Sequence, residues 1–544
     1  MNAIVDRAKV APLDERCDRM SHVFVTRADL TRLVCDAWLL PGKDDGGPRV
    51  SEKWLQSNPL LAAQFEGGRL VAPHDRACER VWRLPGVGKD DPHAYFVNTG
   101  AYGTEALDWY LEALHQFFAV VEADWSASGH RPERERPLIG VPILGTHKRG
   151  AHMSRGAIMV AILRELYSGA DRLGADIALV TLHDSDFSAA QWARQRLTPE
   201  RDPWRSLSLG NLGCVAEHLA ARARNGRLVL FLGAGVSAGA GLPTWDDLLG
   251  RLADLAGFSV AEQAAMLERL AAIDRADLIS RALADRGTSL SAEIVATMES
   301  GRYSLSHALA ASLPVQEIVT TNYDELFEMA CEAIGRPVAQ LPYKPDRDRD
   351  RWLLKLHGTL GRPEDLVLTR DDYLAYHDRR AALSGIVQGL LITKHMLFVG
   401  FSLTDETFHR IAHDVRKAIR PQGAEERRSE FGTAILLDED PLRQRLWAGD
   451  VRFVSAGMPQ AGREAAARRV EIFLDRILAD STTNNQHLLD MTYDDLLNPE
   501  ERELRDALLV FFEQAGSSAA ARAPAWGELD QLARRLGRSD VVQP

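Results

Sequence analysis

An uninterrupted apolar run, Leu228–Leu232, is followed at once by a loop of small residues that begins with Gly233, Ala234 and Gly235. Five consecutive apolar residues predict a strand that is buried on both faces, as the strands of parallel sheets are. The small residues let the chain turn sharply and let a ligand approach the backbone without meeting Cβ atoms. A helix that begins in this loop would aim its free N–H groups at the turn, which suits a diphosphate. A strand followed by Gly-x-Gly is also compatible with an ordinary tight turn in an α/β domain.

The chain has 544 residues, so two or three domains are expected rather than one. Hydrophobic residues make up 45% of it and charged residues 26%, which is the composition of a soluble globular protein. Its formal net charge of −12 argues against a general binder of nucleic acid or of anionic membranes. No apolar run approaches the roughly 20 residues of a membrane-spanning helix, and residues 1–20 lack the apolar core of a secretion signal. We therefore expect a cytoplasmic protein that does not enter a membrane.

The cysteines are scattered, and no two of them form a Cys-x-x-Cys pair. A zinc-ribbon site is therefore not expected, and we expect no metal. Most of the thiols should be reduced, inert and partly buried. The cysteines are Cys17, Cys35, Cys78, Cys214 and Cys331.

Strand-like and helix-like segments alternate through the first 200 residues, which predicts an α/β domain. The expected helices are Thr104–Ala123 and a segment from about Gly156 to Leu173, both with apolar residues at helical spacing. The expected strands are Val23–Thr26, Ala37–Leu40, Tyr95–Thr99, Asp176–Thr181 and the beginning of Pro137–Ala151.

Three pieces of this region, ADLTRLVCDAWLL, IGVPILGTHKRGA and ADIALVT, are similar to the macro domain, a module that binds ADP-ribose. The resemblance covers roughly residues 20–185. It implies that Asp29 contacts an adenine and that Gly145 and Thr146 hold the distal phosphates of an ADP-ribose-like nucleotide. From its residue type alone, Asp29 is also suited to be an N-cap or a turn residue.

The segment Pro41–Asp45 stands where the macro family usually carries an Asn-rich loop that supports hydrolysis of ADP-ribosyl bonds. Hydrolysis by this domain is therefore not expected. Nucleotide sensing and a purely structural role both stay open.

A polar segment with two prolines, Thr198–Leu209, predicts a domain boundary. We therefore divide the chain into residues 1–200, 201–480 and 481–544. The part between Leu248 and Ser312 is rich in Ala, Leu, Arg and Glu, which predicts a lobe of several helices. The expected core positions of this lobe are Leu252, Leu255, Leu267, Leu270, Ile279, Leu283, Ile294 and Met298.

Two or three amphipathic helices are expected between Leu488 and Leu536, one of them at Glu500–Gln514. The Ala-rich segment Gly516–Pro524 is expected to be a flexible connector. Helices that follow a finished sheet either cover it or form a seam between copies of the chain, and the sequence leaves both open.

Three further motifs follow strand-like runs in the middle of the chain. Asn322 and Asp324 lie in the segment TTNYDELFE, His357 follows WLLKL, and Gly400 and Ser402 follow MLFV. Ligand groups gather at the carboxyl ends of strands in an open α/β sheet. Taken singly, the Asn and Asp would serve as helix caps, and the His would be a structural histidine. Six strand-like runs separated by helical stretches predict a doubly wound parallel sheet.

In this order, the glycine loop with its extension SAGAGLPTW and the three later motifs resemble the sirtuin (silent-information-regulator) family of NAD-consuming enzymes. The resemblance covers roughly residues 225–456 and implies a Rossmann-like sheet with NAD+ as the substrate. It implies that Asn322 orients the nicotinamide-side ribose, that Asp324 supports it, and that His357 is the general base. The NAD-contacting set that it implies is Gly233, Ala234, Gly235, Ser237, Pro243, Thr244, Asp246, Thr321, Asp324, Gly400 and Ser402. The zinc-ribbon ligands of the family are absent, and the helical lobe stands in their place.

The missing zinc module and the extra domains look like those of bacterial defence sirtuins, which hydrolyse NAD+ to ADP-ribose and nicotinamide and are thought to deplete NAD+ after phage infection. We therefore expect a zinc-independent NAD+ glycohydrolase. Two alternatives stay open: an NAD-dependent protein deacylase or ADP-ribosyltransferase, and a catalytically silent NAD- or ADP-ribose-binding module. The analogy further implies a homo-oligomer and a phage-derived or operon-encoded protein trigger.

Overall fold

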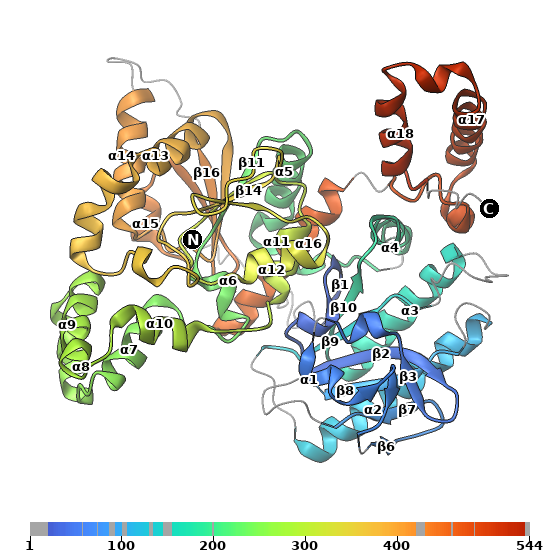
Figure 1. Cartoon of the computed structure of the whole chain (residues 1–544), viewed down its shortest axis with the longest axis horizontal. Coiled ribbons are helices and arrows are strands. Elements are labelled where there is room, and N and C mark those ends of the chain that lie inside the picture. Colours follow the sequence, from blue (N-terminus) through green and yellow to red (C-terminus); the bar gives the residue numbers. More distant parts are fainter. Residues whose placement is uncertain are drawn as a thin grey trace, which may run out of the picture.

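Two α/β units and a helical C-terminal segment make up the fold of the chain (Figure 1). The structure is a computed structural model. It describes residues 20–56, 58–72, 74–85, 93–100, 106–129, 134–144, 155–198, 201–419, 430–458, 461–482 and 485–538.

In the described part of the central unit, β11 (Leu228–Leu232) lies in the middle of a seven-stranded sheet whose neighbouring strands all run parallel. The order across the sheet is β13-β14-β12-β11-β15-β16-β17. The other strands are β12 (Glu317–Thr320), β13 (Ala339–Leu341), β14 (Trp352–Lys355), β15 (His395–Val399), β16 (Gly432–Leu436) and β17 (Val451–Ser455). Apart from the short edge strand β13, this is the strand order of a doubly wound nucleotide-binding sheet, and the predicted parallel sheet is confirmed.

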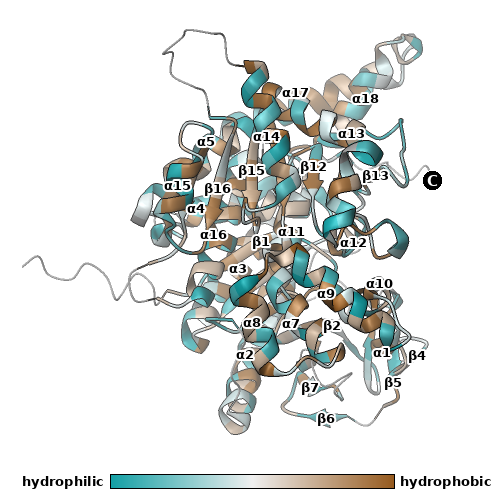
Figure 2. Cartoon of the chain, turned by 90° about the vertical axis from the view of Figure 1, so that its left-hand side faces the viewer, coloured by the Kyte–Doolittle hydropathy of each residue, from teal (hydrophilic) through white to brown (hydrophobic). Residues whose placement is uncertain are grey.

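Alternate residues of β11 face two different cores, because successive side chains of a strand point to opposite faces. Leu230 belongs to the core that contains residues of α5 (Leu212–Arg224), α11 (Leu305–Ser312) and α16 (Arg463–Ser481). Phe231 belongs to the core beneath α13 and α14 on the other face. The bounds of these two helices are Arg370–Thr393 and Glu406–Ile419. Figure 2 shows the hydrophobic strands of this sheet enclosed between helices with hydrophilic outer sides.

The predicted helical lobe consists of four helices at one end of the molecule in the view of Figure 1. Its helices in the described chain are α7 (Trp245–Leu255), α8 (Val260–Arg269), α9 (Ala272–Asp285) and α10 (Leu290–Met298). Five of the predicted core positions are buried. The prediction is wrong for Leu255, Leu267 and Leu270, which are 49%, 64% and 37% exposed. Leu267 and Leu270 are exposed because α8 buries only Met266, and Leu255 is the last residue of α7.

The N-terminal unit is built on a mixed sheet in which five strands run parallel, in the order β1-β10-β9-β2-β8 within the described residues. Their bounds are β1 (Val23–Arg27), β10 (Asp176–Thr181), β9 (Leu138–Pro142), β2 (Ala37–Asp44) and β8 (His93–Asn98). The antiparallel additions are β3 (Pro48–Val50), β4 (Phe65–Glu66), β5 (Arg69–Leu70), β6 (Asp75–Arg76) and β7 (Val81–Arg83). The main helices are α2 (Leu107–Ser128), α3 (Arg155–Leu173) and α4 (Asp184–Leu197). The predicted strands and helices of this unit are confirmed.

The strand predicted at Ala37–Leu40 is longer in the structure and includes most of the segment Pro41–Asp45. Strand β2 continues through Pro41 to Asp44, because this stretch pairs with β8 on one side and with β3 on the other. Gly42 serves this pairing: a Cβ atom there would lie 2.6 Å from the ring of Phe96. The Pro-Gly pair therefore permits a close approach of strands and does not form a turn.

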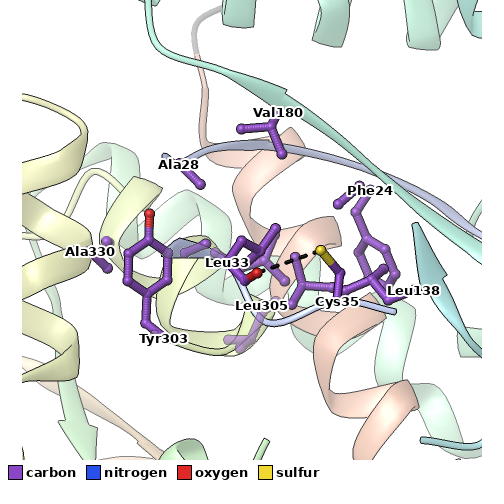
Figure 3. Packing of buried hydrophobic residues seen from close by; sticks show 14 of the residues in the cluster. Phe24, Ala28, Leu33, Cys35, Leu138, Val180, Tyr303, Leu305 and Ala330 are labelled. Atoms are coloured by element: carbon purple, nitrogen blue, oxygen red, sulfur yellow. Dashed lines mark hydrogen bonds between the residues drawn. The ribbon is translucent and has the colours of Figure 1, made fainter. Parts of the chain in front are cut away.

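One apolar core runs through both α/β units. Figure 3 shows Leu33 and Cys35 of the N-terminal unit beside Tyr303 and Leu305 of the central unit. Buried ion pairs reinforce this joint, since Arg468 of α16 binds Asp176 of β10 at 2.7 Å. The described part of the predicted boundary segment also packs here, with Leu207 fully buried. The division of the chain at residue 200 stays a prediction.

The C-terminal segment docks on the N-terminal unit rather than on the central sheet. It comprises η6 (Met491–Leu496), α17 (Pro499–Gly516), η7 (Ala519–Arg522) and α18 (Trp526–Arg535). Tyr493 is fully buried and donates a hydrogen bond to Asp186 of α4. The prediction of a flexible connector is wrong in part, because residues 519–522 form a helical turn. Within the described ranges, no helix combines the length and the apolar character that a membrane crossing requires.

Candidate active site

The four predicted motifs lie at the carboxyl ends of four neighbouring strands. Thr320 of β12 pairs in register with Lys355 of β14, so Asn322 and His357 each lie two residues beyond a paired position. Leu232 of β11 pairs with Val399 of β15, and the two glycine loops begin directly after this pair. The predicted residues therefore meet at one edge of the sheet, beside the point where the strand order reverses.

The two glycine loops pack backbone against backbone. The amide of Gly233 donates to Val399 O at 3.0 Å, and that of Gly235 donates to Gly400 O at 3.0 Å. A Cβ atom on Gly235 would lie 2.8 Å from Cα of Gly400, so side chains are excluded here. Gly400 also has a φ of +65°, which favours glycine. After the turn, the short helix α6 (Ala234–Ala238) begins as predicted, and Gly235 stays exposed to solvent.

The amide group of Asn322 is fixed by two donated hydrogen bonds. Nδ2 donates to Gly233 O at 3.1 Å and to Ser237 Oγ at 3.1 Å. Because both acceptors require the NH2 group, the hydrogen bonds assign the orientation of the amide. Its Oδ1 atom is shielded from solvent and has no hydrogen-bond partner. Asn322 therefore presents a free carbonyl acceptor.

Ser237 and Asp324 hold this asparagine in place. Ser237 Oγ donates to Asp324 Oδ2 at 2.8 Å, and Asp324 Oδ1 accepts the amide of Leu326 at the start of α12 (Leu326–Ala333). Asp324 thus accepts an amide at the start of α12, whose N-cap position is Glu325, and also supports the site. Both side chains are almost fully buried.

His307, which the sequence did not single out, completes the network from α11. Its Nε2 lies 3.4 Å from Ser237 Oγ, and its Nδ1 lies 2.8 Å from Ser304 Oγ. Burial lowers the pKa of His307 to about 4, although Asp324 opposes this effect, so the ring is neutral near pH 7. The capping box formed by Ser304 and His307 was the only signal in the sequence, and it predicts a helix start rather than a site.

His357 is 4% exposed and lies against two tyrosine rings of α13, with centroid distances of 5.5 Å to Tyr373 and 6.2 Å to Tyr376. Its Nε2 has no hydrogen-bond partner and lies 3.5 Å from Oδ2 of Asp405. Burial lowers the pKa of His357 below 6.5, and Asp405 partly offsets the effect. The imidazole is therefore neutral near pH 7 and able to accept a proton.

Lys355 fixes the backbone that carries Asn322 and Asp324. This lysine is fully buried, and its Nζ donates to Asp324 O at 2.6 Å and to Glu328 Oε1 at 2.9 Å. A buried ammonium requires such a partner. Sequence reasoning missed Lys355 because it read WLLKL only as an apolar strand.

The remaining predicted residues divide into two groups. The amide of Thr321 donates to Leu232 O at 3.4 Å, and Pro243 is buried. Ser402 is exposed, with its Oγ 2.6 Å from Thr404 Oγ1. Thr244 occupies the N-cap position of α7, and Asp246 is 70% exposed and pairs with Arg275 in the helical lobe. The structure thus brings together Gly233, Gly235, Ser237, Asn322, Asp324 and Gly400 in one network.

The predicted nucleotide site of the N-terminal unit is described only at Asp29. Its Oδ1 accepts the amide and the hydroxyl of Thr31, so it caps a 3-10 turn at Leu30–Arg32. Its backbone N–H donates to the hydroxyl of Tyr303 at 2.8 Å. Gly145 and Thr146 lie outside the described residues. Within the ranges that the structure describes, no three His, Cys, Asp or Glu side chains are grouped to hold a metal ion.

The fold and the site define a doubly wound α/β unit with an asparagine and a histidine at neighbouring strand ends, beside the point where the strand order reverses. Residues 316–451 match the family model of the SIR2-like domain. The chain therefore carries a SIR2-like domain, and the predicted resemblance to sirtuins is confirmed for this region.

Similar curated proteins extend the comparison. The NAD(+) hydrolase ThsA of Enterococcus faecium is 31% identical over 201 residues, which cover 36% of this chain and 41% of that protein. ThsA of Bacillus cereus (strain MSX-D12) is 31% identical over 204 residues, 35% of this chain and 40% of that protein. Defense-associated sirtuin 2 of Bacillus subtilis is 27% identical over 211 residues, 38% of this chain and 20% of that protein. The chain thus spans about two fifths of the length of the ThsA relatives it matches.

Proposed function

We propose that the chain hydrolyses NAD+ to ADP-ribose and nicotinamide in the cytoplasm, as an antiphage effector that depletes NAD+. One observation carries the proposal: Asn322 Oδ1 and His357 Nε2 are buried polar atoms without hydrogen-bond partners at adjacent strand ends. Buried polar atoms are normally satisfied, so an unpartnered pair calls for a ligand. The names of the similar proteins, NAD(+) hydrolase and defense-associated sirtuin, support the choice of NAD+.

In the proposed reaction, the bond between C1′ of the ribose and the nicotinamide nitrogen breaks, and its electron pair neutralises the positive ring as nicotinamide leaves. A water oxygen forms the new bond to C1′. Asn322 Oδ1 accepts a hydrogen bond from a ribose hydroxyl or from this water. His357 Nε2 accepts the proton that the water loses, and its lowered pKa keeps it in the basic form near pH 7. These groups act mainly by orientation, because their neighbours fix them beforehand.

The glycine loops are proposed to hold the diphosphate. Since the amides of Gly233 and Gly235 already bond to the neighbouring loop, the first turn of α6 would contribute through the amide of Ala234. Gly400 and Ser402, both exposed, would contact a ribose or the diphosphate. Pro243, Thr244, Asp246 and Thr321 stay proposed contacts.

For the N-terminal unit we propose a nucleotide-sensing or scaffolding role that affects the site through α11. The backbone N–H of Asp29 donates to the hydroxyl of Tyr303, which lies four residues before His307 and just before α11. An oligomeric assembly and a protein trigger remain part of the proposal, in analogy with defence proteins.

The test is to incubate the purified full chain with NAD+, with and without an acetylated peptide, and to quantify nicotinamide. We expect release without peptide. Release that depends on the peptide would instead indicate a deacylase or ADP-ribosyltransferase. Tight NAD+ binding without release would indicate a silent binding module.

A further inference from the structure

Three arginines converge where the C-terminus of α11 meets the N-terminal unit. Arg27 ends β1, and its backbone exchanges hydrogen bonds with Ser312 Oγ at 3.3 Å. Arg351 lies just before β14, and its Nη1 donates to Ala311 O at 2.8 Å. Arg336 follows α12 and acts electrostatically on both other arginines. The C-terminal end of α11 therefore binds the backbone of Arg27 and the guanidinium group of Arg351 through two consecutive residues.

The guanidinium groups have fewer partners than their burial requires. The side chain of Arg27 is 3% exposed, and its carboxylate partner, Asp184, is half exposed. Nε and Nη2 of Arg27 are shielded from solvent without a hydrogen-bond partner, and the same holds for Nε and Nη2 of Arg351. Among the described residues, no carboxylate forms an ion pair with Arg336 or Arg351. Four buried N–H donor atoms thus have no acceptor.

The electrostatics of this arginine cluster are unfavourable without an anion. Burial, together with the charges of Arg336 and Arg351, lowers the pKa of Arg27 to about 9. The neighbouring thiol of Cys331 supplies no negative charge, because burial raises its pKa to about 12. Like charges that are buried without partners destabilise a fold strongly.

Aromatic rings account for only part of this arrangement. Arg27 lies 5.8 Å from the ring centroid of Phe187, and Arg351 lies 5.8 Å from that of Phe327. Such contacts cover the flat face of a guanidinium, whereas its N–H donors lie in the plane of the group. In-plane guanidinium donors match the oxygens of a phosphoryl group, to which they bind in pairs.

We propose that Arg27, Arg336 and Arg351 form a binding site for a phosphoryl anion at the joint between the two α/β units. The site is separate from the NAD+ pocket and does not depend on the proposed NAD+ hydrolysis. It adjoins the C-terminal end of α11, the helix that carries His307 to Ser237. The shared chemistry is a phosphate or diphosphate, either free or as part of a nucleotide such as ADP-ribose.

The test measures binding of sodium pyrophosphate to the full chain by calorimetry and by the shift in melting temperature, at constant ionic strength. Arg27→Met and Arg351→Met should weaken pyrophosphate binding at least about tenfold, since each loses charge-assisted hydrogen bonds. Arg336→Met removes no hydrogen bond within the described residues. It is therefore the variant for the pyrophosphate-binding test if Arg27→Met and Arg351→Met fail to fold. Arg349→Met is the matched control, because Arg349 is exposed and pairs with Asp346 in the same segment.

The site is supported if the wild type and Arg349→Met bind pyrophosphate and the variants of the arginine cluster do not. Equal binding by the cluster variants and the wild type would overturn it, as would a wild type that pyrophosphate neither binds nor stabilises. Titration with inorganic phosphate and with ADP-ribose separates the sources. A preference of about tenfold or more for ADP-ribose, lost in the cluster variants, identifies a nucleotide, whereas equal affinity identifies the free anion.

Discussion

Ser237 donates its hydroxyl hydrogen to Asp324 at 2.8 Å, which leaves its oxygen only able to accept from Nδ2 of Asn322. Asn322 must therefore use its NH2 group toward Ser237. Its carbonyl oxygen Oδ1 points the other way and has no hydrogen-bond partner. The orientation of the central polar group of the site therefore depends on a serine in the glycine loop of another strand.

Ser237→Ala should lower kcat for NAD+ hydrolysis about tenfold, because the amide of Asn322 loses one of two hydrogen bonds that fix its orientation. The buried Asp324 carboxylate also loses a donor. Steady-state measurement of nicotinamide release checks this expectation. Ser291→Ala changes a partly exposed serine of the helical lobe, is the control and should leave kcat unchanged. Wild-type kcat in Ser237→Ala would contradict the proposed role of the network.

The pH profile should report on His357. Because burial lowers its pKa, the acidic limb of kcat/KM should lie below pH 6.5. Asp405 raises the pKa of His357, so Asp405→Asn should move this limb to lower pH. Tyr373→Phe separates the charge effect from the lost hydrogen bond, since Tyr373 donates to Asp405 at 3.0 Å. A limb that moves to higher pH in Asp405→Asn would exclude His357 as the titrating base.

Lys355→Met should destabilise the fold by about 3–5 kcal/mol, because the carboxylate of Glu328 is then buried without its partner. The double variant Lys355→Met/Glu328→Leu should recover much of this loss. Urea unfolding followed by circular dichroism measures both. If the single and double variants were equally stable, the contributions of Lys355 and Glu328 to the free energy of unfolding would not be coupled.

Stability should fall as the pH drops from 6.5 toward 4. Burial lowers the pKa of His307, His395 and His487 to about 4 each. In this window the unfolded chain binds protons that the folded chain does not, so the free energy of unfolding decreases with falling pH. Each histidine contributes up to about 3 kcal/mol, at about 1.36 kcal/mol per unit. Urea titrations of the wild type and His487→Gln test this, and an unchanged slope in the variant would contradict it.

The strands and the glycine loops could be predicted because their signals are local. Leu228–Leu232 is apolar throughout, and Gly233 follows directly. The strand and the turn can therefore both be predicted from neighbouring residues. Strand β13 could not be predicted, because its three residues are too few to show the alternation of apolar and polar side chains that marks a strand. The predicted strand Ala37–Leu40 ended too early, because pairing with β8 and β3 continues it through Pro41 and Gly42.

The supporting residues of the site could not be predicted, because their roles exist only in three dimensions. His307 is 15 residues before Asn322, and nothing in its helix shows that it faces Ser237. The prediction that Leu267 is buried was wrong for the same kind of reason. Helical spacing does not tell whether a second layer covers the helix. Arg27, Arg336 and Arg351 are far apart in sequence, and the fold alone brings them together.

The central claim is that Asn322 and His357 act on NAD+ at one sheet edge. The most direct test is nicotinamide release by the wild type, Asn322→Ala, His357→Ala and His395→Gln, with urea unfolding to confirm that each is folded. His395 is a buried histidine that is hydrogen-bonded to Thr433. It begins β15, whereas the site lies beyond the carboxyl end of this strand, so His395→Gln should retain activity. We predict that Asn322→Ala and His357→Ala are folded and release no nicotinamide. Turnover at the wild-type rate in both variants would contradict the account.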